Sequence, residues 1–272
     1  MMLSSQGLDA YFKRIGYDGP ATPTLDTLRS LQHLQPLAIP FENLDSWRGL
    51  PVSLKPDAVF QKLVHAKRGG YCFEQNQLLM RVLQSLGFSV SGLSARVLWM
   101  QAGQEALPRT HKALLVNVDG EQWIADAGFG GQTMTAPLRL ASSAAQESPH
   151  GLFSVTRSGE LYRVAALVAD QWQPLYECSL DAYLPVDYET ANWYVSTHPQ
   201  SRFVNNLICS RVDATGRHVL LDTHYSHYRL DAAPESRNAA TPEELRSLLQ
   251  TTFGIGLDEL QGLEPKLASL FS

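Results

Sequence analysis

A cysteine placed directly after two glycines is the residue of this chain best suited to chemistry. Cys72 lies in the stretch KRGGYCFEQN, at the expected start of a helix over residues 72–87. Free backbone N–H groups and the positive dipole end in the first turn of a helix favour an anion, here a thiolate. Gly69 and Gly70 predict a sharp backbone turn with room for a substrate near the sulfur. Because core packing is the commoner role of a free cysteine, a nucleophile also needs a base nearby.

A predicted hairpin supplies that base. Asp119-Gly120 is a two-residue turn signal between alternating apolar residues. In the register that this turn sets, His111 and Asp126 are diagonal neighbours on one face, whereas a shift of one residue would separate them. A carboxylate that orients an imidazole leaves the second ring nitrogen free to accept a proton from a thiol. Cys72, His111 and Asp126 are therefore the expected catalytic triad.

The surrounding elements divide the chain into three parts. Residues 1–87 are predicted to form a helical bundle, in which Thr22 caps a helix that begins at Pro23 and Gly69 ends the next one. Residues 88–190 alternate in short runs that are typical of an antiparallel sheet or small barrel. Residues 191–272 are predicted to be a connecting helix followed by an α/β lid. The expected fold class is α+β.

Composition excludes several classes of protein. The chain has 272 residues, 44% of them hydrophobic, which is enough for a substantial core. A net charge of −5 gives no reason to expect nucleic acid or an acidic membrane as a partner. The first residues do not resemble a secretory signal, and no apolar run is long enough to span a bilayer. Three unclustered cysteines argue against a disulfide framework and favour a reduced cytoplasm, with Cys178 and Cys209 in the core.

Four stretches together resemble the arylamine N-acetyltransferase family, in the family's order along the chain. They are IPFENLD (39–45), RGGYCFEQN (68–76), HKALLV with DAGFGG (111–116 and 126–131), and STHPQSRF (196–203). The resemblance implies a helical bundle, β-barrel and lid, with a core similar to papain-like cysteine proteases and transglutaminases. It also implies transfer of an acetyl group from acetyl-CoA to arylamines, arylhydrazines or N-hydroxyarylamines, by a ping-pong route through an acetyl-cysteine, in xenobiotic metabolism. Cys72, His111 and Asp126 fall on the family's triad positions.

The resemblance also implies residues that contact the substrates. Those expected to line the acceptor pocket are Phe41, Tyr71, Val97 and Phe129. Those expected to contact CoA are Thr110, Gly128, Gly130, Gly131 and Phe203. Successive glycines can present backbone N–H groups to an anion, although GFGG has neither the spacing nor the following helix of a dinucleotide fingerprint.

Some residues are expected to support the fold without taking part in chemistry. An ion pair between Glu42 and Arg68, joined by Arg14, is predicted to hold the cysteine loop. His224 and His227 have a spacing that suggests metal, but no further ligand cluster accompanies them in the sequence, so no metal is expected. The histidines expected at the surface or at caps are His33, His65, His150, His198 and His218. The tryptophans expected in the β core are Trp99, Trp123, Trp172 and Trp193.

Three alternatives remain open. A hydrolase or peptidase would use the same triad with water as the acceptor. An amide synthase that closes macrolactams, a close relative of the family, would need a long polyketide-like acyl substrate. A non-enzymatic binding module would leave Cys72 an ordinary thiol. The expected partners are a CoA thioester and a small aromatic amine or hydrazine, and the chain is expected to be a monomer or homodimer.

Overall fold

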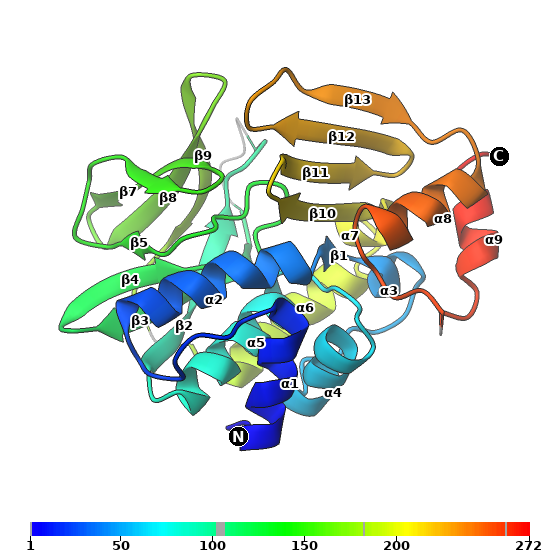
Figure 1. Cartoon of the computed structure of the whole chain (residues 1–272). Coiled ribbons are helices and arrows are strands. Elements are labelled where there is room, and N and C mark those ends of the chain that lie inside the picture. The colour runs from blue at the N-terminus through cyan, green and yellow to red at the C-terminus, as the bar shows by residue number, and fades with distance from the viewer. Residues whose placement is uncertain (1, 102–106, 182, 259) are drawn as a thin grey trace.

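Two antiparallel sheets and a group of helices make up the fold, and most helices lie below the sheets in the view of Figure 1. The computed structural model describes residues 2–101, 107–181, 183–258 and 260–272. The helices are α1 (Ser5–Ile15), α2 (Leu25–Ala38), α3 (Leu44–Trp47), α4 (Pro56–Phe60), α5 (Cys72–Ser85), α6 (Pro185–Thr197), α7 (Arg202–Asn205), α8 (Pro242–Thr251) and α9 (Leu263–Ala268).

The larger sheet curls into a nearly closed barrel (Figure 1). Its strands are β2 (Ser89–Val97), β3 (Arg109–Val118), β4 (Glu121–Ala125), β5 (Leu138–Arg139), β6 (Gln146–Ser148), β7 (Gly151–Ser158), β8 (Leu161–Val168) and β9 (Gln171–Cys178). They are hydrogen-bonded in the order β5-β4-β3-β2-β9-β8-β7-β6. The α+β prediction with a central antiparallel barrel is confirmed.

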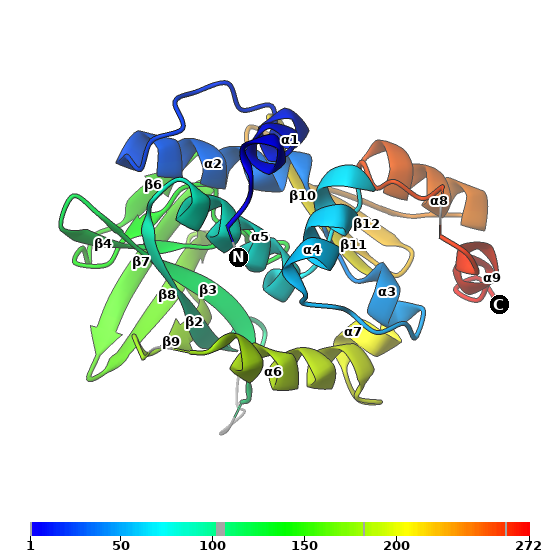
Figure 2. The ribbon, with the colours of Figure 1, turned by 90° about the horizontal axis from the view of Figure 1, so that it is seen from below.

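The smaller sheet forms the lid together with α8 and α9 (Figure 1). Its strands are β1 (Phe41–Glu42), β10 (Ile208–Asp213), β11 (Gly216–Leu221), β12 (His224–Arg229) and β13 (Glu235–Asn238). They are ordered β1-β10-β11-β12-β13, so a strand of the N-terminal part adds to the lid. In Figure 2, α6 runs along the lower edge of the view from the barrel toward α7.

Helix α5 is fixed against the barrel by an apolar stripe. Leu78, Leu79, Val82 and Leu83 recur at helical spacing and are at most 1% exposed. They share one core with residues of β3 and β4, including Leu114. Since each fully buried leucine contributes roughly 1.5–3 kcal/mol, this packing holds α5 against β3.

The helix boundaries correct two predictions. Thr24, not Thr22, caps α2, because its hydroxyl accepts the N–H of Thr27 at 3.3 Å. The next helix does not extend to Gly69: α4 passes into a π-helical turn, η1 (Gln61–His65), that ends at His65. The prediction that residues 1–87 are helical missed β1, where Phe41 pairs with Ser210.

Burial corrects the expectations for several aromatic side chains. Trp172 and Trp193 are 45% and 65% exposed, so their placement in the β core was wrong, whereas Trp123 is buried. His150 and His218 are buried among hydrogen-bond partners instead of lying at the surface.

Two further expectations have different outcomes. Cys178 and Cys209 are both buried, as expected. His227, by contrast, lies beside His218 and Asp213, so the prediction that no ligand cluster accompanies it was wrong.

The three-part division of the chain stays a prediction. One hydrophobic cluster contains residues from two of the predicted parts. Leu44 and Trp47, from the N-terminal part, pack in the lid cluster with Leu249 and Phe253. Within the described ranges, no helix has the length and hydropathy needed to cross a membrane.

Candidate active site

Cys72 is the first residue of α5, as the sequence predicted. Tyr71 before it is extended, and its N–H donates to the Glu74 carboxylate at 3.1 Å, which fixes the start of the helix. Gly69 and Gly70 have ordinary negative φ, so turning freedom is not their role. A Cβ on Gly69 would lie 2.2 Å from the Pro40 carbonyl oxygen. The chain therefore needs glycine at this position so that the backbone can pass close to Pro40.

The β3–β4 hairpin has the predicted register. Val118 pairs with Glu121 across the Asp119-Gly120 turn, and both turn residues have positive φ. An irregularity in the β2–β3 ladder lies beside His111: Ala95 pairs with His111 and the next residue of β2 pairs with Arg109. Thr110 is thus the extra residue of a β-bulge. Bulges bend a strand and re-aim side chains, and here the Thr110 carbonyl lies 3.7 Å from the Cys72 sulfur.

His111 and Asp126 form the predicted hydrogen bond, 2.7 Å between Nε2 and Oδ2. The other carboxylate oxygen accepts two bonds of 2.8 Å, from the Asn76 amide and the Gly128 N–H. Asn76 also accepts the N–H of Ala127 at 3.0 Å. Since all these groups are buried, the Asp126 carboxylate has a single orientation toward the imidazole.

The electrostatics of His111 favour its cation. Burial opposes the charge, but the charge and hydrogen bond of Asp126, with those of the Cys72 sulfur, outweigh it and raise the pKa of His111 to about 10. Because Nε2 is bonded to Asp126, Nδ1 is the nitrogen that remains for the sulfur. The three side chains therefore meet, with the His111 ring bonded to the Asp126 carboxylate and to the Cys72 sulfur.

Aromatic rings surround the sulfur and the imidazole. Phe41 and Tyr71 belong to one buried cluster with Cys72, and Phe203 packs against it. Phe129 meets the His111 ring edge-on, with centroids 5.2 Å apart.

Val97 is connected to the sulfur less directly than the other acceptor-pocket candidates. Val97 ends β2 opposite Tyr176, whose ring lies 4.9 Å from that of His111. Tyr71 is fully buried and its hydroxyl donates to Asn192, so its ring is fixed in place.

The glycine loop after β4 uses its first glycine differently from the prediction. The Gly128 N–H is bonded to Asp126, and a Cβ there would lie 2.9 Å from the Cys72 Cα. Gly128 therefore lets the loop pass against the nucleophile. Gly130 has φ +87° and lies beside the Phe41 ring, so Gly130 and Gly131 remain the candidates for an anion-binding loop.

A buried ionic network supports the cysteine loop. The predicted pair is present: Arg68 and Glu42 approach to 2.7 Å, with the Glu42 side chain fully buried. Arg14 does not join it, because its Nε donates to the Leu63 carbonyl instead. The pair extends through Asp45 to Lys62, which also binds Glu74 in the first turn of α5.

Sequence reasoning missed Asn76 and Tyr176. Asn76 lies four residues after Cys72, which puts both on one face of α5, and that spacing was a usable signal. Tyr176 is brought beside His111 only by the β2–β9 pairing, which no local pattern predicts.

The chain is similar to known proteins of one family. The sequence model of a family described as N-acetyltransferase matches residues 24–261. The arylamine N-acetyltransferase of Mycolicibacterium smegmatis is 41% identical over 259 residues, with 94% of each chain covered. The arylamine N-acetyltransferase / N-hydroxyarylamine O-acetyltransferase of Salmonella typhimurium is 38% identical, covering 93% of this chain and 90% of its own. The solved Mycobacterium marinum arylamine N-acetyltransferase in complex with CoA superposes with a TM-score of 0.93 at 36% identity, covering 97% and 99% of the two chains.

Proposed function

The chain belongs to the arylamine N-acetyltransferase family, and from this we propose that it moves an acetyl group from acetyl-CoA to the nitrogen of arylamines, arylhydrazines or N-hydroxyarylamines. The observation that supports the proposal is the contact of Cys72, at the start of α5, with an imidazole held by a buried carboxylate. This arrangement supports an acyl carrier on sulfur.

In the first half-reaction the Cys72 thiolate attacks the carbonyl carbon of the acetyl-CoA thioester. The N–H groups in the first turn of α5 face the developing oxyanion and stabilise it. The carbon–sulfur bond to CoA then breaks, and the leaving sulfur takes the proton from the His111 imidazolium. One thioester replaces another, so this half-reaction is close to balanced in free energy.

In the second half-reaction the neutral amine attacks the acetyl-cysteine. His111, now neutral, takes the proton from the amine nitrogen, and the tetrahedral intermediate collapses to the amide. Cys72 leaves as thiolate, which restores its ion pair with the imidazolium. A poorly hydrated aromatic pocket favours the amine over water, and we assign its lining to Phe41, Tyr71, Val97 and Phe129.

We assign CoA recognition to the glycine loop and its surroundings. Gly130 and Gly131 carry the N–H groups proposed to face the pyrophosphate. Thr110 and Phe203 flank the sulfur, through the Thr110 carbonyl and the aromatic cluster respectively. Gly128 acts on the same ligand indirectly, by letting the loop lie against Cys72.

The test is mass spectrometry of the intact protein mixed with acetyl-CoA alone. We expect one acetyl group on Cys72, discharged when an aromatic amine is added. Cys72→Ala should abolish the adduct and Cys178→Ala should keep it, because burial raises the pKa of the Cys178 thiol to about 12. Discharge by water as fast as by amine would support a hydrolase instead, and no adduct at all would refute the acyl carrier.

Steady-state kinetics provide an independent check. Two half-reactions through one covalent intermediate predict parallel initial-rate plots when acetyl-CoA and amine are varied together. Intersecting plots would mean that both substrates bind before any bond breaks.

A further inference from the structure

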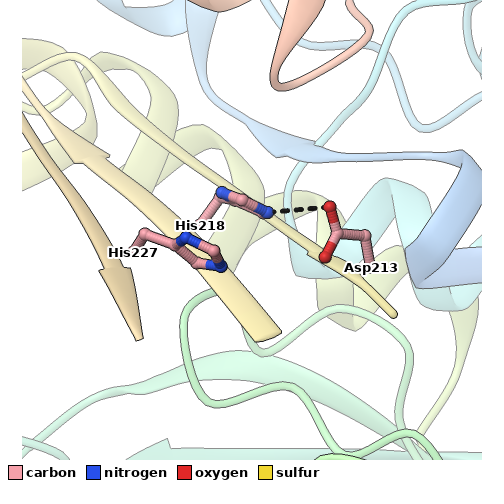
Figure 3. Close-up of side chains that lie close together, drawn as sticks. All are labelled: Asp213, His218 and His227. Atoms are coloured by element: carbon pink, nitrogen blue, oxygen red, sulfur yellow. Dashed lines mark hydrogen bonds and ion pairs between the residues drawn. The ribbon is translucent and has the colours of Figure 1, made fainter. Parts of the chain in front are cut away.

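Three potential metal ligands meet on the lid sheet, outside the triad. Asp213 ends β10, His218 lies on β11 and His227 on β12 (Figure 3). His218 and His227 are direct cross-strand partners, so both side chains are on one face of the sheet. The short β10–β11 turn brings the Asp213 carboxylate to 2.9 Å from His218 Nε2. One ligand atom from each residue lies within 4.8 Å of the other two.

We propose that Asp213, His218 and His227 form a binding site for a divalent transition-metal ion of the zinc type. Two imidazoles and one carboxylate are a donor set that such ions prefer over magnesium or calcium. Three protein ligands leave the fourth tetrahedral position for water. The Asp213 side chain is 42% exposed, so an ion reaches the site from solvent.

The distances fit after a small movement of one ring. Bonds of about 2.1 Å hold the donors of a tetrahedral ion roughly 3.4 Å apart, so the longest separation must shrink by at most about 1.4 Å. The rings of His218 and His227 are stacked, with planes 19° apart. An ion lies in the plane of each ring that binds it, so one ring must turn. His227 is the ring with room to do so, since it is only partly buried and its Nε2 is bonded to the exposed Thr215 hydroxyl.

The surroundings orient the other two ligands. The Tyr225 hydroxyl is 2.8 Å from His218 Nδ1, the nitrogen on the far side of the ring from Asp213. The other Asp213 oxygen accepts the N–H and hydroxyl of Thr215 at 2.8 and 2.6 Å. Such outer partners fix the ligand tautomer and raise metal affinity.

Neighbouring charges leave the carboxylate available. Arg211 shares the sheet face of Asp213, but its guanidinium donates to the carbonyls of Leu37 and Thr252. Glu235 is the cross-strand partner of His227 on β13, and its carboxylate pairs with Arg229 at 3.3 Å.

An ion at this site would join three strands that also support the glycine loop. Arg217, the neighbour of His218, donates to the carbonyl oxygens of Gly131 and Thr133 at 3.3 and 2.8 Å. Because metal binds the folded lid and not the separated strands, it should raise the melting temperature.

The experiment uses the full chain, treated with chelator and alkylated at Cys72 so that this thiolate cannot bind the ion. Titration with Zn²⁺ in a calorimeter should show one ion per chain, and Mg²⁺ should show no heat. His227→Gln should weaken binding by at least about tenfold and abolish the rise in melting temperature. The matched control is His224→Gln on the same strand, which projects to the opposite face and should bind as the parent does.

Four results would overturn the proposal, and the first three use the parent and His227→Gln. These three are the absence of saturable Zn²⁺ binding, equal affinity of His227→Gln and the parent, and a Co²⁺ spectrum with a thiolate charge-transfer band, which would assign the ion to a cysteine. Asp213→Asn is the second variant, and its circular dichroism establishes folding before its affinity is compared. Unchanged affinity in folded Asp213→Asn would also exclude this donor set.

Discussion

The proposed triad and the lid each contain a histidine bonded to an aspartate, and the two histidines differ in the direction of their pKa shift. The distances are close, 2.7 Å for His111 and Asp126 against 2.9 Å for His218 and Asp213. Yet the pKa of His111 is raised to about 10, whereas the pKa of His218 is lowered from its ordinary value.

The difference lies in what surrounds each pair. Burial lowers both histidine pKa values, but at His111 the fully buried Asp126 and the Cys72 sulfur outweigh it. At His218 the partly exposed Asp213 does not, and the nearby His227 and Arg211 add to the lowering. A histidine–aspartate contact alone therefore does not identify a catalytic base. Its neighbours decide whether the imidazole carries a charge.

The largest expected effect comes from removing the charge of the buried carboxylate. Asp126→Asn keeps the shape but loses the stabilised imidazolium and its tautomer, so the rate of Cys72 acetylation should fall by roughly 10³- to 10⁴-fold. Single-turnover mass spectrometry with acetyl-CoA measures that rate. The matched change in the lid, Asp213→Asn, should leave it within about twofold. Equal losses in the two variants would remove the contrast between the pairs.

Glu42→Gln tests whether a buried ionic pair matters more than an exposed one for the free energy of unfolding. Glu42 is fully buried against Arg68, so neutralising it leaves a buried cation underpaired and should cost about 3 kcal/mol of unfolding free energy. Chemical denaturation measures this, with Glu160→Gln, a 92% exposed partner of Arg157, as the nearly neutral control. The folded variant should keep the alkylation rate of Cys72. A normal denaturation midpoint with a dead thiol would contradict a purely supporting role.

Asn76→Ala tests the orientation of Asp126 separately from its charge. The amide supports one carboxylate oxygen, so its loss should slow acetylation by about 10- to 100-fold, less than the loss of the charge. Gln84→Ala, at an exposed position of the same helix, is the control. If Asn76→Ala equals Asp126→Asn in rate, orientation and not charge would dominate.

The most gradual effect is the dependence of stability on pH. The pKa of His111 rises on folding from about 6.5 to about 10, so the folded state binds the extra proton between these values. The stabilisation is complete below pH 6.5 and is lost as the pH rises toward 10. The difference in unfolding free energy between the parent and His111→Gln should shrink over that window. A difference that grows with pH would mean that His111 is neutral when folded.

Local signals account for what could be predicted. Asp119-Gly120 sets the register of a two-strand hairpin, so the bond between His111 and Asp126 followed from the order of residues alone. The apolar spacing of α5, together with the two glycines before it, likewise predicted that a helix begins at Cys72.

Contacts between distant segments could not be predicted in this way. Asp213, His218 and His227 come from three strands whose shared face was not predicted, and the bulge at Thr110 depends on β2 as much as on β3. Trp172 and Trp193 were misplaced because hydrophobicity does not say which face of a strand or helix is covered. The helix cap was assigned to Thr22 instead of Thr24 because the sequence does not distinguish two threonines that are two residues apart as N-caps.

Arg217 limits how the lid can be exchanged between relatives to make chimeric proteins. Its buried guanidinium, on the lid, is satisfied by main-chain oxygens of the barrel at Gly131, Thr133 and His150. A lid transplanted from a relative with an apolar residue at this position would leave these three carbonyl oxygens without their hydrogen-bond donor. Chimeras should therefore work only when the graft boundary keeps this arginine with its acceptors, however well the two surfaces match in shape.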